Sequence, residues 1–353
     1  MKNELFNLID KLQKNRSLTL QEYQKLIEGF DSELYYYCSE KAREEAKKYY
    51  GNKIYIRGLI EISNFCKNDC YYCGIRKSNK NACRYRLNKN EIIDCCKEGY
   101  ALGFRTFVLQ GGEDAYYSDE VLCEIIGEIK KIYPNCAITL SLGERSKESY
   151  ERLFAFGADR YLLRHETADK EHYERLHPNS MKFENRMKCL ESLKAIGYQV
   201  GCGFMVGSPY QGAKELACDL KFIEEFSPHM CGIGPFITHK DTPFKQEKCG
   251  SVPLTLFLLS LIRLIKPNIL LPATTALGTA DKDGREKGVL SGANVIMPNL
   301  SPNNVREKYM LYEGKIFSGQ ESAQCVRELK AKMEKIGYSV VCDRGDIANE
   351  ETR

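Results

Sequence analysis

Three cysteines, Cys66, Cys70 and Cys73, stand close together in the segment NFCKNDCYYCGIRK, with the spacing C-x3-C-x2-C. A structural zinc ion is closed by four protein ligands, and an iron–sulfur cluster that only transfers electrons is usually held by four cysteines. Three thiolates on one loop would leave one metal position without a protein ligand. Because a small molecule can bind at an open position, this spacing predicts a centre that takes part in chemistry.

The same cysteines leave a zinc site as an alternative. Cys83 follows ten residues after Cys73 and could supply a fourth ligand, but no histidine lies close in the sequence. The paired cysteine spacings that are typical of zinc sites are absent. We therefore favour an iron–sulfur cluster with one iron free of protein ligands.

The rest of the chain must position these cysteines. From residue 54 onward, short apolar runs alternate with longer helical patterns, which predicts strands and helices in turn. The strands are expected at residues 54–63, 104–112, 135–143, 159–166, 199–207, 229–237, 270–278 and 294–299. Eight βα units over roughly 250 residues favour an α/β fold of the (β/α)8 TIM-barrel type. The alternative is a doubly wound open sheet, but neither of the glycine-rich nucleotide motifs of such folds occurs.

The chain of 353 residues is long enough for such a barrel with extensions at both ends. Apolar residues at helical spacing predict an N-terminal helical extension over residues 1–53. The barrel is expected over residues 54–310, and a C-terminal helix with a charged tail over residues 311–353.

Every predicted strand ends in polar or glycine residues, and in a barrel these ends meet at one rim, where active sites lie. The cysteine triplet follows the first strand, with the aromatic Tyr72 just before its last cysteine. This arrangement resembles the radical S-adenosylmethionine (SAM) superfamily. The resemblance implies a [4Fe–4S] cluster on Cys66, Cys70 and Cys73, with SAM on the fourth iron, and reductive cleavage of SAM to a 5′-deoxyadenosyl radical.

A SAM pocket needs groups for a carboxylate, an ammonium and a ribose. An arginine fork suits the carboxylate, and a glutamate suits the ribose hydroxyls. Arg164 and Glu166 alternate at the end of the fourth predicted strand and so face the same side. The resemblance places the GGE stretch at Gly111 against the SAM ammonium. The expected cofactor-binding residues are Tyr72, Gln110, Gly112, Glu113, Ser141, Glu144, Arg164, Glu166 and Arg186; any one of them could instead form a surface salt bridge or a loop cap.

Longer stretches are more specific than the cysteine triplet. GLIEISNFCKNDCYYCGIRKSNKN, TLSLGE, ADRYLLRHETA, GIGPFITHKDTP, PATTALGT and GANVIMPNLSP resemble the HydE family of [FeFe]-hydrogenase maturases, over residues 58–314. The resemblance implies maturation of the hydrogenase H-cluster. The radical would attack the cysteine sulfur of an iron carbonyl cyanide precursor made by the maturase HydG, and the product would pass toward the scaffold HydF. A low-potential electron donor is also implied.

The family also has anion and substrate sites inside the barrel, and the resemblance places Arg164 among the residues that line them. The further candidates are Thr274, Thr275, Met230, Met297 and Tyr309. Thr274 and Thr275 are adjacent, so at most one side chain would point into the barrel if both lay in a strand. The two methionines could instead fill gaps in the core.

One departure concerns an accessory cluster that some relatives hold on a C-x7-C-x2-C motif near the C-terminus. Phe317 and Glu328 stand where two of those cysteines would be, and only Cys325 remains. Cys249 and Cys342 do not restore the spacing. A second cluster at this place is therefore not expected.

Three other functions remain open. A methylornithine synthase or a biotin-synthase-like sulfur-insertion enzyme would share the cofactors, and Cys136 and Cys202 on predicted strands leave room for a second cluster of the latter kind. A scaffold or metal carrier without catalysis would need no SAM pocket.

Composition excludes several other classes of protein. The formal charge is +4 with the charged residues well mixed, so no nucleic-acid partner is expected. The most apolar helical run, at residues 254–265, is too short to cross a membrane and contains Arg263. Sixteen cysteines in a chain of this length are unlike a disulfide scaffold, and no secretory signal is seen. We therefore expect a cytoplasmic protein with reduced cysteines.

Overall fold

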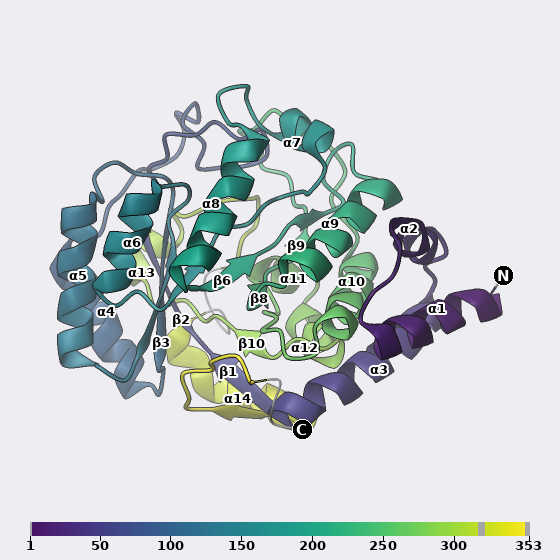
Figure 1. Cartoon of the computed structure of the whole chain (residues 1–353). Helices are drawn as coiled ribbons and strands as arrows, with labels where there is room; N and C mark the ends of the chain where they lie inside the picture. The colour runs from purple at the N-terminus through teal and green to yellow at the C-terminus, as the bar shows by residue number, and fades with distance from the viewer. Residues whose placement is uncertain (1, 317–321, 350–353) are drawn as a thin grey trace.

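The computed structural model, which describes residues 2–316 and 322–349, has parallel strands at its centre and helices around them (Figure 1). Six strands pair in the order β2-β3-β4-β5-β6-β8, and every pairing is parallel. Their bounds are β2 Gly58–Ser63, β3 Thr106–Gly111, β4 Ala137–Ser141, β5 Arg160–Leu162, β6 Gln199–Cys202 and β8 Met230–Cys231. Long crossover segments join them, as parallel pairing requires.

Single parallel bridges close this sheet into a ring. Leu270 pairs with β8, Pro272 pairs with β10 (Val295–Ile296), and Asn299 pairs with Leu59 of β2. The ring therefore contains eight strand positions, and the prediction of a (β/α)8 barrel is confirmed over the open sheet.

Helices surround the ring and bury their apolar sides against it. They are α4 Lys89–Ala101, α5 Asp119–Ile132, α6 Lys147–Ala155, α7 Lys170–Leu176, α8 Phe183–Ile196, α9 Ala213–Phe226, α10 Val252–Ile265, α11 Thr275–Ala280, α12 Gly284–Leu290 and α13 Asn303–Arg306. Polar side chains cap several of them; for example, Asn88 begins α4 with a reciprocal bond to Glu91. These caps fix the residue at which each capped helix begins.

An N-terminal group of helices covers one side of the barrel, at the right of Figure 1. It consists of α1 Lys2–Asn15, α2 Leu20–Glu28 and α3 Ser32–Tyr50. Helix α3 packs on α10, and α2 packs on α9. This packing explains why α10 is apolar almost all round: it lies between the extension and the barrel. Its Arg263 is fully buried and donates to backbone oxygens of Pro267, Ile269 and Gly292.

Several predicted strands are interrupted. The run at 54–63 divides into β1 (Lys53–Ile56) and β2, and the runs at 199–207 and 229–237 end in a separate pair, β7 (Met205–Val206) with β9 (Gly234–Pro235). Gly203, with φ +154°, lies at the break in the run at 199–207. A Cβ added there would lie 2.0 Å from the oxygen of Gly232. The strand prediction at 270–278 is wrong from Thr275 onward, because α11 begins there.

The C-terminal segment returns to the base of the barrel. Helix α14 (Val326–Lys335) confirms the helix that was expected there, and a short 3-10 turn, η2 (Ala323–Cys325), precedes it. An unexpected strand, β11 (Ser339–Val341), then pairs with β1. Beyond it, Asp346 accepts from the buried guanidinium of Arg160 at 2.5 Å. The tail thus packs against the barrel strands. The expected domain boundaries stay predictions.

Candidate active site

The three cysteines lie on a long loop, residues 64–88, which connects β2 to α4 and which we call the cysteine loop. The guanidinium of Arg84 holds this loop together by donating to backbone oxygens of Asn64, Ile75, Arg76 and Asn79. The Asn64 side chain donates to backbone oxygens of Cys83 and Lys308. Buried polar groups thus fix a loop that has no regular secondary structure.

The end of β3 lies directly against the cysteine loop. A Cβ added at Gly112 would lie 2.2 Å from the Phe65 oxygen and 2.8 Å from Cβ of Cys66, so only glycine fits. The Lys67 amide donates to the Glu113 backbone oxygen at 2.9 Å. The Glu113 carboxylate accepts from the Glu144 amide at 3.0 Å and forms an ion pair with Lys67 at 3.1 Å. The GGE stretch therefore supports the loop.

The three thiols influence one another electrostatically. Burial raises the pKa of Cys66 and the pKa of Cys70, and it raises the pKa of Cys73 to about 12. Cys73 and Cys66 raise the pKa of Cys70 further, and Cys66 does the same to Cys73. Three thiolates so placed need a compensating positive charge, which a metal centre would supply.

The same geometry bears on the kind of metal. Among residues 2–316 and 322–349, no group of three or more His, Cys, Asp or Glu side chains is arranged to hold a metal ion. A [4Fe–4S] cluster does not need such convergence, because each thiolate binds a different iron. The choice between a cluster and a zinc ion therefore stays a prediction.

Two polar side chains at the end of β5 have buried atoms without hydrogen-bond partners. Nη2 of Arg164 lies 3.2 Å from Oε2 of Glu166, but the contact lacks hydrogen-bond geometry. Nε of Arg164 is also without a partner among the described residues. Glu166 has φ +67°, an uncommon value for glutamate, and its carboxylate contributes to the raised pKa of Cys73. Unsatisfied groups beside the cysteines are what a polar ligand such as SAM would use.

Arg186 on α8 reaches back to the same place. Its Nε donates to Glu144 at 2.6 Å, and its Nη1 donates to the Arg164 backbone oxygen at 2.6 Å. Burial disfavours its charge, yet Tyr173 and Glu144 hold the pKa of Arg186 well above its usual value. The hydroxyl of Tyr173 is itself buried without a partner in the described part of the chain. Arg186 thus remains charged and orients both Glu144 and the Arg164 backbone.

The remaining expected SAM residues complete this rim. Gln110 and Ser141 are opposite one another at the ends of β3 and β4. The Tyr72 hydroxyl lies 3.0 Å from Nε2 of His177, and Met181 contacts Cys70 through sulfur at 3.6 Å. The structure therefore gathers the expected cofactor residues around the cysteine loop, while their roles stay predictions.

The expected substrate residues do not form one group. Met230 and Met297 join an apolar cluster with Leu270 and Val295, which agrees with the core-filling interpretation of both methionines. Thr274 is the N-cap of α11 and donates to the Ile233 oxygen at 3.1 Å, and Thr275 opens that helix. Both threonines therefore lie where the strand has already ended.

Tyr309, the last expected substrate residue, lies instead with polar groups near the barrel rim. Its ring is buried, and its hydroxyl accepts from Nε2 of Gln110 at 3.5 Å.

Of the positions compared with the accessory-cluster motif, Phe317 lies outside the described residues. Cys325 ends η2, and Glu328 lies on α14.

Sequence reasoning missed a buried ion pair beside Tyr309. Lys315 lies 2.7 Å from Oε1 of Glu61 on β2, and both side chains are almost fully buried. Asn299 donates to the other oxygen of Glu61, and the Lys315 ammonium lies over the Tyr309 ring. Glu61 is a charged residue inside the apolar run GLIEIS, and this unusual position was a signal that it has a role. Nothing in the sequence pointed to Lys315, which is 254 positions away.

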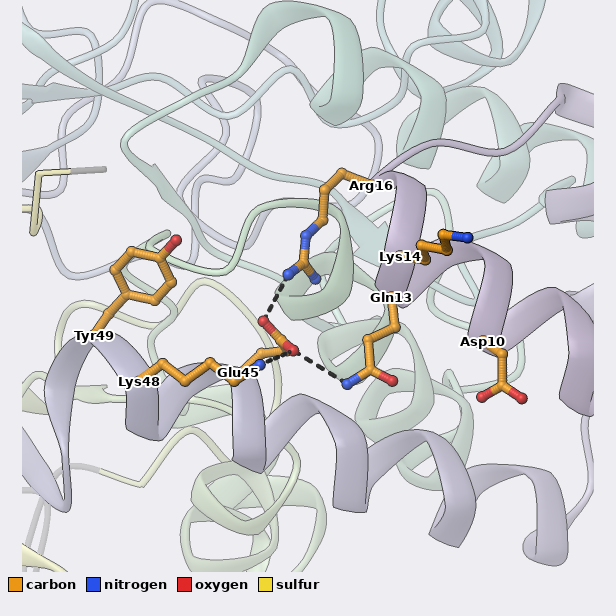
Figure 2. Close-up of a pocket in the computed structure, with 7 residues that line it drawn as sticks. All are labelled: Asp10, Gln13, Lys14, Arg16, Glu45, Lys48 and Tyr49. Atoms are coloured by element: carbon orange, nitrogen blue, oxygen red, sulfur yellow. Dashed lines mark hydrogen bonds and ion pairs between the residues drawn. The ribbon is translucent and has the colours of Figure 1, made fainter. Parts of the chain in front are cut away.

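A cavity of about 720 Å³ lies outside the barrel, between α1 and α3, and its lining includes none of the expected site residues (Figure 2). Glu45 is buried there and accepts from Gln13, Arg16 and Lys48. These contacts fasten the N-terminal helices to one another. The candidate active site is therefore the rim at the cysteine loop.

The fold and the rim define a class of enzyme. Residues 60–223 match the family model of the Radical SAM superfamily, and the chain belongs to this superfamily. Membership implies a [4Fe–4S] cluster and SAM as cofactors. Within the superfamily the chain belongs to the HydE family: it is 45% identical to the [FeFe] hydrogenase maturase subunit HydE of Thermotoga maritima over 88% of this chain and 87% of that protein.

More distant relatives share the architecture. The 3-methylornithine synthase of Methanosarcina acetivorans is 27% identical over 89% of this chain and 92% of that protein. The crystal structure of the methylornithine synthase PylB superposes with a TM-score of 0.83 at 25% identity, covering 95% of this chain and 97% of that one.

In the described ranges no helix is both long and apolar enough to cross a membrane.

Proposed function

We propose that this enzyme acts in the maturation of an [FeFe]-hydrogenase, as its HydE relative does by name. The observation that carries the proposal is the position of the cysteine loop. The loop brings three thiols together beside buried polar atoms of Arg164 and Glu166 that have no hydrogen-bond partner among the described residues. This arrangement is what a three-cysteine cluster with SAM on its open iron requires.

Each group of the rim then has a role. Cys66, Cys70 and Cys73 hold three irons and leave one for SAM. A cluster held in this way would supply the electron for reductive cleavage of SAM to methionine and a 5′-deoxyadenosyl radical. Arg164 receives the SAM carboxylate through Nε and Nη2, which have no hydrogen-bond partner among the described residues, and Glu166 accepts from the ribose hydroxyls.

Other rim residues position these groups. Arg186 is a positioning residue, because it donates to Glu144 and to the Arg164 backbone. Gly112 lets β3 approach the cysteine loop, and Glu113 ties Lys67 to the Glu144 backbone. Tyr72, Gln110 and Ser141 complete the SAM pocket.

We infer that the substrate is a cysteine-bound iron carbonyl cyanide complex made by HydG, and that the radical attacks its cysteine sulfur. A carbon–sulfur bond would form, and the iron of the complex would take up the unpaired electron and so be reduced by one electron. The product would pass toward HydF. The identity of 45% to HydE supports this choice. Tyr309, Gln110 and the Glu61–Lys315 pair offer polar groups inside the rim, where such a complex would meet the radical. Thr274, Thr275, Met230 and Met297 remain further candidates.

Anaerobic reconstitution with iron and sulfide, followed by dithionite and SAM, tests the cofactor part of the proposal. The product to measure is 5′-deoxyadenosine. Cys70→Ala should abolish it, because one iron loses its ligand. Cys83→Ala is the matched control, since Cys83 is an exposed cysteine on the same loop. Full activity of Cys70→Ala would overturn the assignment, and loss of metal in Cys83→Ala would favour zinc.

A second measurement tests the substrate. With the HydG product present, the 5′-deoxyadenosyl group should be transferred to that product. The amount transferred should exceed the amount of SAM that is cleaved without transfer. If the HydG product changes nothing while SAM cleavage persists, the maturation role is wrong. The methylornithine-synthase alternative would then gain weight, given the shared fold. Failure to bind SAM at all would favour a non-catalytic scaffold.

A further inference from the structure

Positive charge is concentrated on the cysteine loop. Residues 64–86 contain six basic residues and one acidic residue, a formal charge of +5, although the whole chain carries only +4. The rest of the chain therefore carries a formal charge of −1. The even mixture of charges along the sequence hides this local exception.

Four of these cations face solvent, namely Lys67, Lys77, Lys80 and Arg86. Among the described residues, Lys77 and Lys80 have no ion-pair partner. Lys67 and Arg86 pair with Glu113 and Asp114, but the side chains of these acids are only 10% and 3% exposed, whereas Lys67 is 64% and Arg86 is 37% exposed. The outer surface of each pair is thus its positive end. We call these four residues the basic patch.

One partly buried and one exposed aromatic ring lie beside the basic patch. The Arg86 guanidinium lies 3.9 Å from the ring centre of Phe65 and 5.1 Å from that of Tyr116, whose exposed fraction is 50%. Phe65 directly precedes Cys66. Tyrosine and arginine are enriched at the centres of protein interfaces, and the rim of an interface is polar and accessible to solvent. This surface therefore has the composition of a protein-binding site and lies on the loop that carries the cysteines.

We propose that the basic patch, with Phe65 and Tyr116, is the docking surface for an acidic one-electron carrier protein. The inference rests on the proposed function, because each reductive cleavage of SAM consumes one electron. The carrier is oxidised by one electron and the cluster is reduced by one, without a bond forming or breaking. Docking on the loop that holds the cluster shortens the path that the electron must cross. Opposite charge on the carrier would steer it to this face.

The test uses the reconstituted protein and an acidic flavodoxin as the probe. Binding is measured by titration at low and high salt, and electron transfer from the flavodoxin hydroquinone is followed by stopped flow. Lys77→Glu/Lys80→Glu should weaken binding at least tenfold at low salt and slow electron transfer. The difference should shrink at high salt, because salt screens exposed charges. Dithionite is small and needs no docking surface, so it should reduce this variant and the wild type equally.

The matched control is Lys14→Glu/Lys47→Glu on the N-terminal helices, which changes the formal charge equally. Its affinity should stay within twofold of wild type. The proposal is overturned if both double variants lose affinity equally, or if neither does. Competition by short duplex DNA with the same residue dependence would assign the patch to nucleic acid instead. Because flavodoxin binding is measured without SAM, its failure is distinct from failure of SAM cleavage with dithionite.

Discussion

Gly112 lies where β3 meets the cysteine loop, and a methyl group there would overlap the Phe65 oxygen. We expect Gly112→Ala to push the loop outward and to lower stability by about 2 kcal/mol, as overpacking does. Iron and sulfide incorporation should fall by more than half, as measured by metal analysis after reconstitution. Gly127→Ala on α5 is the control, because its nearest contact would be 4.0 Å away. Normal iron content in Gly112→Ala would show that the loop does not depend on this contact.

Glu166 tests the SAM pocket without touching the cluster. Glu166→Gln removes the charge that would strengthen hydrogen bonds from the ribose hydroxyls. We expect SAM affinity to fall about tenfold, which is about 1.4 kcal/mol, with iron content unchanged. Equilibrium dialysis with labelled SAM measures the change. Glu151→Gln, in an exposed pair with Lys147, should leave the affinity as it is. Equal SAM affinity in all three proteins would remove Glu166 from the pocket.

At the scale of elements, helix α9 supports the strand end that carries Arg164 and Glu166. His165 lies between them and contacts Asp219 of α9. The Gly203 amide donates to Nδ1 of His165, so the imidazole proton is on Nε2, 3.1 Å from Oδ1 of Asp219. The Ala168 amide donates to the same oxygen. Burial lowers the pKa of His165 to about 3 and raises the pKa of Asp219 well above its usual value, so burial opposes charge on both partners.

We predict from these shifts that the His165–Asp219 pair is neutral, and substitution of Asp219 tests this prediction. Asp219→Asn keeps an accepting oxygen and removes no charge, so the free energy of unfolding should change by less than about 1 kcal/mol. Asp219→Ala leaves two N–H donors unsatisfied and should cost about 3 kcal/mol. Urea unfolding of the apoprotein measures both. If Asp219→Asn lowers the free energy of unfolding as much as Asp219→Ala does, His165 and Asp219 form an ion pair and are not neutral.

The elements also show what the sequence could predict. Alternating apolar runs and helical patterns identified the barrel, because each βα unit is a local pattern. The breaks at Gly203 and Thr275 were missed, since they depend on how two backbones approach in space. Strand β11 and the Glu61–Lys315 pair were missed for the same reason: their partners lie hundreds of residues away. The cysteine triplet was recognisable because its three members share one loop.

At the scale of the whole molecule, folding keeps His177 neutral. Its side chain is buried between Tyr72 and Tyr173, and burial, with Arg186 nearby, lowers the pKa of His177 to about 3. The unfolded chain has the ordinary histidine pKa of about 6.5, so between pH 6.5 and 3 it binds a proton that the folded state does not. Acid therefore favours unfolding, and the contribution of His177 is lost as the pH falls below about 6.5.

The difference between wild type and His177→Gln isolates this effect, because other titrating groups cancel. From pH 7.0 to 5.5, wild type should lose about 1 kcal/mol more unfolding free energy than the variant. Urea unfolding of the apoprotein at both pH values gives the comparison. An identical pH dependence in the two proteins would contradict a buried neutral His177.

The central claim is that the cluster has one iron without a protein ligand and that SAM binds there. The most direct measurement is electron–nuclear double resonance on the reduced, reconstituted protein with SAM that carries ¹⁵N in its amino group. We expect a ¹⁵N hyperfine coupling to the cluster spin, and we expect it to vanish when unlabelled SAM is used. Bound SAM that shows no such coupling would mean that the fourth iron is not its site, which would contradict the central claim.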